Sequence, residues 1–444
     1  MKNKEFRFRE VLTDLLVLLT GTLLILYPGR LGYASIQQAK FDLFLLLFGG
    51  YAFLMLLFSL ELMLIRHLRP PSLRELWRRC TASQRLIILF WLFSLVSTLA
   101  SPYGRQALWG MSRGEGFLTI TLYCAAFLGV SSFARPKAWW CGVFGGAMTL
   151  FDGICLLQLR GFNPLGLYPQ GYSYFDANVK YGGIYLGTTG NADLTAALLT
   201  LAIPLCWVGI LRLQDRLRWL LLIPLGLSLV VLKEMDVQAG LLAVCLGTLL
   251  TIPVVAPLDK KWRLALWGGT ALLLILGFLW VWNSNHTWDT VYELREILHG
   301  NWNPEFGSGR VYIWQELLQR VPEHLLLGTG PDTMAAAGIP GYSRVNSVTG
   351  ELMQFYVDVA HNEYLNVLFH QGILGLLPYV GALLCSCVSW LKKSGEHVGV
   401  AILGSAVLCY CIQAFFGFSM CQTAGVFWVI WGLLEREMSK EEEK

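Results

Sequence analysis

Long apolar stretches recur along the whole chain and restrict its fold more than any other feature. Stretches of about 17 or more predominantly apolar residues follow one another along the sequence, and a helix of that length crosses the hydrocarbon core of a bilayer. Only 14% of the 444 residues are charged, whereas roughly 25% is usual in a soluble protein. The sequence therefore predicts an all-α integral membrane protein.

The apolar stretches divide into about 12 predicted transmembrane helices, which together make residues 1–444 a single polytopic membrane domain. They lie near residues 11–28, 41–65, 83–100, 116–133, 138–157, 192–211, 217–234, 238–257, 263–283, 372–391, 398–417 and 421–434. The first is not expected to be a cleaved signal, because no small-x-small cleavage site follows it and Pro28-Gly29-Arg30 is typical of a turn.

Basic residues are distributed unevenly between the two sides of this predicted bundle. If the N-terminus is cytoplasmic, 23 of the 34 Lys and Arg residues fall in segments on the cytoplasmic side. Cytoplasmic loops of membrane proteins carry such an excess of Lys and Arg. The bias therefore predicts that both termini are cytoplasmic.

Two polar insertions are expected on the external side, near residues 158–191 and at 284–361. Irregular backbone cannot face lipid, so these segments must lie in water, on protein or over a cavity. Within the longer insertion, apolar residues from Val311 to Val321 recur at helical spacing and Pro322 ends the pattern. Residues 350–370 also have a helical pattern. The large loop 284–361 is expected to carry part of an active site.

Cations on the external side need an explanation, because they run against the charge bias. For Arg113 and Arg310 the simplest one is an anionic ligand, since the planar guanidinium donates two parallel hydrogen bonds to a phosphate. The alternative is that each arginine only pairs with a nearby carboxylate, such as Glu115 or Glu305. The residues alone leave both explanations open.

His361 lies at the outer end of a predicted helix and is the candidate for proton transfer. Its imidazole ordinarily titrates near neutrality, so it can take a proton from a hydroxyl or orient one. Asn362 and Glu363 are the adjacent groups available to orient the ring. The alternative, a purely structural histidine, is the more frequent role of a lone histidine.

No familiar metal or nucleophile pattern is present in the sequence. His286, His299 and His324 lack the short spacing of zinc ligands, and neither a Gly-x-Ser-x-Gly elbow nor a Walker loop occurs. We therefore expect no metal, no cofactor and no nucleic-acid partner.

Four stretches of the sequence carry distinctive motifs. They are Trp109-Gly110-Met111-Ser112-Arg113-Gly114-Glu115-Gly116, Gly190-Asn191-Ala192-Asp193, Gly309-Arg310 to Trp314 with Gly328-Thr329-Gly330-Pro331-Asp332, and His361-Asn362-Glu363-Tyr364-Leu365 with Gly372-Ile373-Leu374-Gly375. In this order they resemble the O-antigen ligase and O-antigen polymerase superfamily of bacterial membrane glycosyltransferases. The resemblance covers about residues 85–435 and is strongest over 307–377. It departs at Gln238, where members often have a Ser-Arg-Gly-like segment, so Lys233 or Lys180 would have to supply that cation.

The resemblance implies a GT-C-like fold and transfer of a glycan, without metal, from an undecaprenyl-diphosphate carrier to an acceptor hydroxyl. The acceptor is a glycan, lipid or protein, and the reaction takes place on the outer face of the bacterial cytoplasmic (inner) membrane. In this interpretation His361 and Arg310 are catalytic, and Arg113, Arg310 and Lys180 bind the diphosphate. The supporting residues are Asn362, Tyr364, Asn191 and Trp314. Whether His361 moves a proton or holds the diphosphate is left open.

Several functions share these motifs. Within the superfamily they are ligation, polymerisation of repeat units and O-glycosylation of proteins, and the sequence names neither the sugar nor the acceptor. A transporter or flippase would also have about 12 spans, but the sequence shows no inverted repeat and no matching pair of broken helices. A non-catalytic scaffold would not require two arginines and a histidine on one side.

Overall fold

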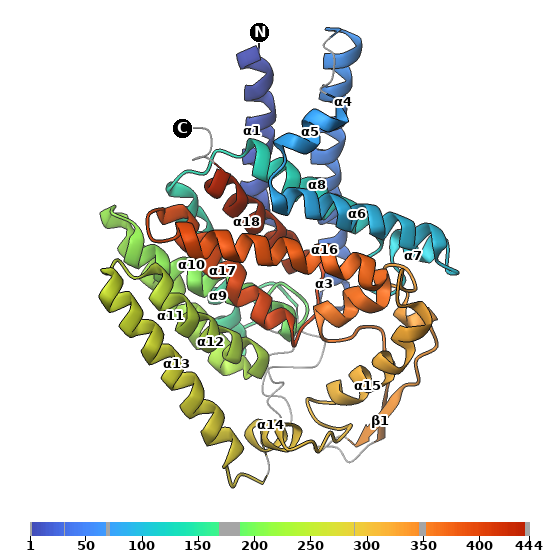
Figure 1. Ribbon diagram of the computed structural model, residues 1–444, viewed down its shortest axis with the longest axis vertical. Coiled ribbons are helices and arrows are strands. Elements are labelled where there is room, and N and C mark those ends of the chain that lie inside the picture. The colour runs from blue at the N-terminus through green and yellow to red at the C-terminus, as the bar shows by residue number, and fades with distance from the viewer. Residues whose placement is uncertain are drawn as a thin grey trace.

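The structure, a computed structural model, describes residues 2–30, 32–67, 72–167, 187–287, 289–345 and 352–439. These residues form a bundle of tilted helices (Figure 1). Seven helices in the described ranges are long and apolar enough to cross a membrane, and Phe117–Phe133 and Val398–Ala414 are shorter apolar helices. The predicted all-α membrane class is confirmed, while the count of 12 spans and the GT-C-like fold stay predictions.

Helical structure coincides with each of the predicted spans. The helices are α1 (Lys2–Thr20), α2 (Leu23–Leu26), α3 (Ile36–Phe44), α4 (Gly50–Leu64), α5 (Leu73–Arg79), α6 (Ala82–Ala100), α7 (Arg105–Trp109), α8 (Phe117–Phe133), α9 (Trp139–Leu159), α10 (Ala192–Arg212), α11 (Leu222–Met235), α12 (Gln238–Val255), α13 (Lys260–Trp282), α14 (Thr290–Leu298), α15 (Arg310–Arg320), α16 (Glu363–Lys393), α17 (Val398–Ala414) and α18 (Cys421–Ser439). Helix α10 is enclosed by α11, α12 and α17, whereas α13 lies at the edge with most of its side chains exposed.

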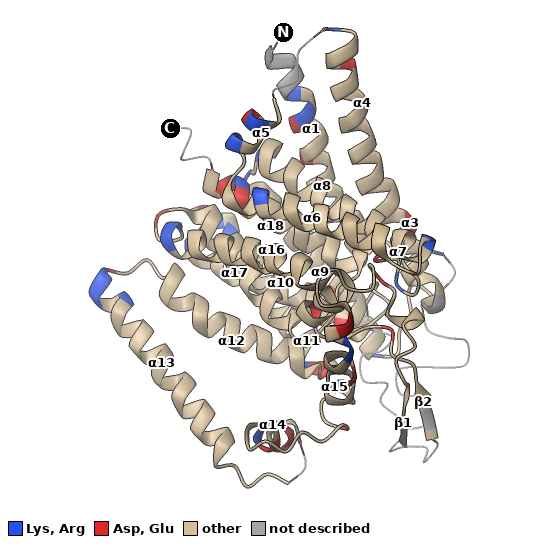
Figure 2. Ribbon diagram, turned by 45° about the vertical axis from the view of Figure 1, so that its right-hand side comes forward, with Lys and Arg blue, Asp and Glu red and all other residues tan. Residues whose placement is uncertain are grey.

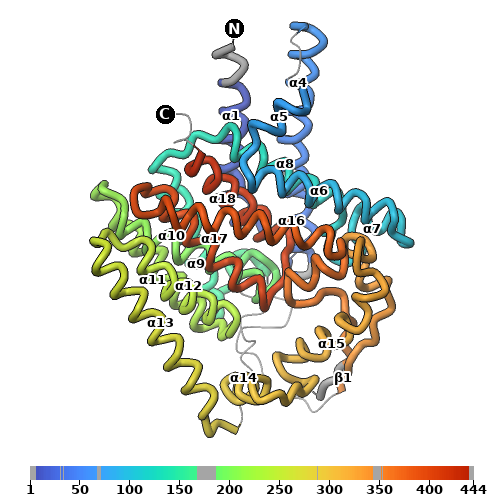
Figure 3. The backbone as a smooth tube through the Cα atoms, in the orientation of Figure 1, coloured from blue at the N-terminus to red at the C-terminus, as the bar shows by residue number. Residues whose placement is uncertain are grey.

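The two ends of the bundle differ. Both termini lie at one end, and α14, α15 and the strands β1 (Tyr342–Val345) and β2 (Leu352–Phe355) lie at the other (Figures 1 and 3). Lys and Arg residues gather near the termini and α5 and at the start of α13 (Figure 2). This distribution agrees with the predicted orientation, which stays a prediction.

The loop 284–361, predicted to be external, contains the expected helix α15, but the second helix expected over residues 350–370 is not formed as predicted. Residues 352–355 form β2, which pairs antiparallel with β1, and the Tyr342 and Phe355 rings stack across the pair at 5.2 Å. Aromatic residues favour such cross-strand pairs, which an apolar pattern alone does not distinguish from a helix. Helix α16 begins only at Glu363, so the expectation is wrong for residues 352–362.

Helix α16 is broken at Gly372, whose backbone (φ 67°, ψ −173°) is not helical. The segment from Leu325 to Gly330 lies against this break. The backbone N–H groups of Thr329 and Gly330 donate to the carbonyls of Phe369 (3.0 Å) and His370 (2.9 Å). A Cβ on Gly372 would lie 2.3 Å from the Leu326 backbone. The backbone of Leu325–Gly330 therefore packs directly against the break at Gly372, and we call this contact the joint. Its hydrogen bonds satisfy the backbone polar groups that the broken helix exposes.

Candidate active site

Segments from four parts of the chain meet beside the N-terminus of α10. They are the loop that carries Arg113, the first turn of α10 with Asp193, the start of α15 with Arg310, and His361 just before α16. Asn191 caps α10, because its Oδ1 accepts from the N–H groups of Asp193 (2.8 Å) and Leu194 (3.3 Å). This cap fixes the backbone from which the Asp193 carboxylate projects.

The Asp193 carboxylate joins the two residues predicted to be catalytic. Its Oδ2 lies 3.5 Å from Arg310 Nη2 and 3.7 Å from His361 Nδ1. The three side chains are between 22% and 27% exposed. The predicted pair Arg310 and His361 is thus brought together by a third residue, at a place that a substrate can reach.

His361 has a restrained backbone. Its φ of 48° is in the left-handed region, which is uncommon for a residue other than glycine. On one side, the Trp314 indole N–H donates to the carbonyl of Ala360 (2.9 Å). On the other, Asn362 caps α16 by accepting from the Leu365 N–H (3.0 Å). The edge of Phe418 also packs against the imidazole, with 5.2 Å between ring centroids. These contacts hold the ring beside Asp193.

The charge state of His361 follows from its surroundings. Burial, and then the positive charges of Arg310 and Arg113, lower the pKa of His361 to about 3. The imidazole is therefore neutral at pH 7. A neutral imidazole has a free lone pair on one nitrogen and can accept a proton there.

Arg310 is held loosely. Its Nη1 donates to the carbonyl of Gly307 (3.1 Å), and its Nη2 lies at the longer distance of 3.5 Å from Asp193. Within the described part of the chain its Nε has no hydrogen-bond partner. The guanidinium therefore keeps unused donor capacity, which a phosphate oxygen would satisfy.

Arg113 is held tightly. Its Nε and Nη2 donate to the two carboxylate oxygens of Asp358, each at 3.0 Å, and its guanidinium lies 4.4 Å from the centroid of the Phe418 ring. Pairing with a carboxylate, the alternative left open for both arginines, is thus observed here with Asp358. Glu115, named as an example of a carboxylate partner in that alternative, instead accepts from the Tyr123 hydroxyl at 2.9 and 3.0 Å.

Asp332 shapes the loop that carries Arg113. Its carboxylate accepts from the N–H groups of Ser112 (3.2 Å), Arg113 (2.9 Å) and Glu115 (3.3 Å), and from the Ser112 hydroxyl (2.9 Å). Because the joint at Gly372 holds the chain just before Asp332, the loop is tied to α16 as well. The Gly328-x-Gly330 motif therefore has a backbone role in this structure.

A small polar cavity adjoins the Arg113–Asp358 pair. It has a volume of about 50 Å³, and its lining includes Glu115, Glu363 and His370 besides the pair itself. Burial raises the pKa of Glu115 well above its ordinary range. A cavity of this size and polarity has room for a few water molecules.

The remaining predicted residues have structural contacts or lie outside the described ranges. The Tyr364 hydroxyl donates to the carbonyl of Cys411 (2.8 Å) and joins α16 to α17. Asn191, Asn362 and Trp314 hold the backbone around the site. Lys180, predicted to bind the diphosphate, lies outside the described residues.

Three aspartates at this site were not among the predicted site residues. Asp193 stood in the Gly-Asn-x-Asp stretch, which was the available signal for it. Asp358 pairs with a residue 245 positions away and Asp332 contacts a loop about as distant, so no local pattern indicated either partner. In the described ranges no cluster of three His, Cys, Asp or Glu residues is arranged to hold a metal ion.

The comparisons with known proteins bear on the family of the chain. Residues 225–380 match the family model described as O-antigen ligase, a range that contains Arg310, the joint at Gly372 and His361. Asp193 and Arg113 lie outside the matched range. A search of curated proteins found no match. The match over residues 225–380 confirms the resemblance of this chain to the O-antigen ligase superfamily of bacterial membrane glycosyltransferases.

Proposed function

We propose that the protein transfers a glycan from an undecaprenyl-diphosphate-linked donor to an acceptor hydroxyl, on the outer face of the bacterial cytoplasmic membrane. The observation that carries the proposal is the convergence of Arg310 and His361 on Asp193. It places a loosely held cation and a neutral imidazole at one partly exposed position. Glycosyl transfer from a lipid diphosphate needs both a cation for the departing diphosphate and a group that accepts a proton.

His361 acts as the base in this proposal. The acceptor oxygen forms a bond to the anomeric carbon while the bond from that carbon to the diphosphate oxygen breaks, and the diphosphate leaves with the electron pair. The hydroxyl proton passes to His361 Nε2, since Nδ1 faces Asp193. The Asp193 carboxylate then stabilises the imidazolium that forms.

Arg310 stabilises the diphosphate as negative charge develops on it. Arg113 belongs to the same positive field, and Lys180 is a further candidate for the donor site. Because these cations supply the electrostatic stabilisation, the proposed reaction uses no metal. Addition of EDTA to the purified enzyme should leave its rate unchanged, whereas a loss restored by a divalent cation would contradict this part of the proposal.

Replacement of His361 tests the assignment most directly. His361→Ala should lower the rate of glycan transfer by about 10²- to 10⁴-fold, because the general base is lost. His324→Ala is the matched control, since His324 is an exposed histidine of the same loop. Transfer would be measured with a lipid-linked glycan donor in membranes that contain equal amounts of each variant. A normal rate for His361→Ala would contradict the site assignment.

Three acceptor classes are compatible with the site: a lipid or wall acceptor, a second lipid-linked repeat unit, and a protein hydroxyl. The same assay separates them when each acceptor is supplied alone. The transporter or flippase alternative predicts movement of the lipid-linked glycan between leaflets with no new glycosidic bond. A lipid-linked product that crosses vesicles but is never transferred would favour that alternative.

A further inference from the structure

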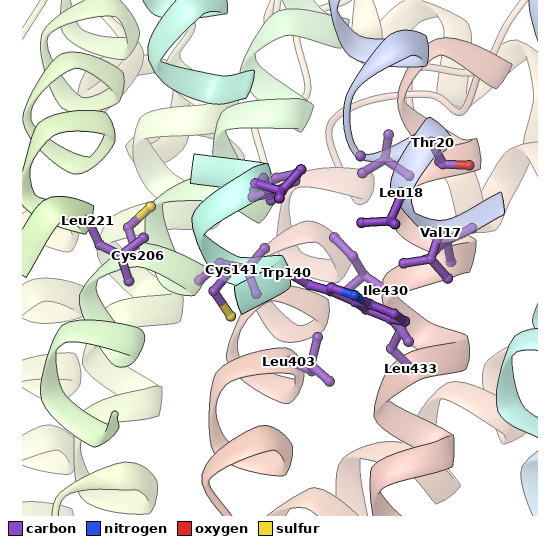
Figure 4. Close-up of a pocket in the computed structure, with 16 residues that line it drawn as sticks. Val17, Leu18, Thr20, Trp140, Cys141, Cys206, Leu221, Leu403, Ile430 and Leu433 are labelled. Atoms are coloured by element: carbon purple, nitrogen blue, oxygen red, sulfur yellow. The ribbon is translucent and has the colours of Figure 1, made fainter. Parts of the chain in front are cut away.

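Two adjoining cavities lie at the opposite end of α10 from the candidate active site. Asp193 is in the first turn of this helix and Arg212 is its last residue, so about 30 Å separates them. The first cavity, of about 90 Å³, lies among α1, α9, α10, α17 and α18 (Figure 4). The second, of about 380 Å³, extends toward the end that carries both termini. The two cavities share the lining residues Trp140, Cys141, Leu403 and Leu433.

The first cavity is apolar except for two side chains. Val17, Leu205 and Ile430 are typical of its lining, and all three come from different helices. The Trp140 indole N–H and the Thr20 hydroxyl are buried there, and neither has a hydrogen-bond partner in the described ranges. A buried donor without a partner is destabilising, so an acceptor atom is expected beside it. Because Trp140 lines both cavities, that acceptor would lie where they meet.

The second cavity has a positive lining. Lys137 is exposed on its wall and has no ion pair among the described residues, although its charge also acts on Asp14. The Arg212 guanidinium donates to the carbonyls of Val255 (2.7 Å), Ser394 (3.1 Å) and Gly395 (3.0 Å), and no carboxylate of the described residues forms an ion pair with it.

Glu437 is the acidic residue of the same lining, and its position limits its effect. A Cβ on Gly399, in the first turn of α17, would lie 2.7 Å from the Glu437 carboxylate. The carboxylate thus lies at a helix N-terminus, where the positive end of the helix dipole compensates part of its charge. The cavity as a whole remains positive.

We propose that these two cavities bind one anionic phospholipid from the leaflet nearest the termini. Part of an acyl chain occupies the apolar cavity, and the headgroup phosphate lies near Lys137 and Arg212. The ester carbonyl between chain and headgroup accepts from the Trp140 indole N–H. A free phosphate would leave the apolar cavity empty, and a neutral lipid would leave the positive charges of Lys137 and Arg212 uncompensated.

The site is separate from glycan transfer and does not depend on the proposed function. The experiment uses the full-length protein in discs of phosphatidylcholine mixed with phosphatidylglycerol, and native mass spectrometry counts the lipids that the protein retains. The wild type should retain phosphatidylglycerol in preference to phosphatidylcholine. Lys137→Gln should lower this preference about fivefold, the effect of one cation near a headgroup. Lys261→Gln, an exposed lysine at the start of α13 that lines neither cavity, should leave it unchanged.

A second pair of variants tests the acyl chain. Leu403→Trp fills the shared wall of the two cavities and should lower the amount of retained phosphatidylglycerol, whereas Leu384→Trp on the exposed face of α16 should not. If Lys261→Gln and Lys137→Gln had equal effects, the lipid preference would come from diffuse surface charge, and the proposed binding site would be wrong. If inorganic phosphate raised the unfolding temperature as much as phosphatidylglycerol does, the ligand would be a phosphate group alone and not a lipid. These results are independent of the transfer assay, so the two proposals fail separately.

Discussion

The two arginines of the candidate active site are held in opposite ways. Arg113 makes two 3.0 Å bonds to Asp358 and stacks on Phe418, and its loop is fastened by Asp332. Arg310 has one long ion pair at 3.5 Å, and its Nε lacks a partner among the described residues. A guanidinium fixed by a bidentate pair with a carboxylate organises the protein around it, whereas one whose Nε lacks a partner is available to a ligand. The difference predicts that the diphosphate contacts Arg310 more directly than Arg113.

The conservative variant Arg310→Lys is the strongest test of this difference. A lysine keeps the charge but loses the planar fork, so we expect transfer to fall about 10²-fold, as when one donor to a developing negative charge is removed. Arg320→Lys at the other end of α15 is the control, because Arg320 pairs with Glu316 at 2.8 Å. The transfer rate at saturating donor provides the measurement. If Arg310→Lys were as active as the wild type, the positive charge alone would be enough for transfer, and a bidentate contact between Arg310 and the diphosphate would be wrong.

Asp193→Asn is expected to have the next largest effect. The amide keeps the size of the carboxylate but removes the charge that faces both Arg310 and His361, so the imidazolium is no longer stabilised. We expect about a tenfold to 100-fold fall in rate, which is part of the contribution of the general base that Asp193 faces. Asp215→Asn, an exposed N-cap at the other end of the bundle, is the control. A rate equal to that of the wild type would mean that Asp193 only balances the charge of Arg310.

The fold was predictable from the sequence where a pattern is local. Apolar runs located the helices. The prediction failed at residues 352–362, because a short aromatic strand and a helix have similar apolar content. It also could not show the joint between Leu325–Gly330 and α16, since the hydrogen bonds there connect backbone groups of segments about 40 residues apart.

The basic residues of the candidate site could be predicted from the sequence, but its acidic residues could not. Arg113 and Arg310 stood out because external cations oppose the charge bias. Of their partners, Asp193 was marked only by the Gly-Asn-x-Asp stretch and Asp358 by no pattern, and each pair forms only when segments distant in the sequence pack together. Glu115, the nearest carboxylate in sequence to Arg113, turned out to pair with Tyr123 instead.

The bidentate pair of Arg113 and Asp358 is expected to contribute a measurable coupling free energy to the stability of the protein. Their side chains are 18% and 32% exposed, so solvent screens the pair in part, and we expect a coupling free energy of about 1 kcal/mol in a double-mutant cycle. The cycle uses Arg113→Gln, Asp358→Asn and the double variant, with thermal unfolding of the purified protein as the measurement. The same cycle with Arg310→Gln and Asp193→Asn should give a smaller coupling. Equal couplings would remove the distinction between the two arginines.

The pH dependence should show the smallest effect and separates the two arginines once more. With the pKa of His361 lowered to about 3, the imidazole stays neutral between pH 7.5 and 5.5, so the transfer rate should change by less than about twofold over this range. Removing a nearby cation favours the protonated ring and raises the pKa of His361. Arg310→Gln should therefore move the acid limb of the rate profile further upward than Arg113→Gln, because Arg310 contributes more to the lowering. If the transfer rate of the wild type fell with a midpoint near pH 6.5, the pKa of His361 would not be lowered and a neutral His361 would be wrong. The profiles of Arg310→Gln and Arg113→Gln would then not differ.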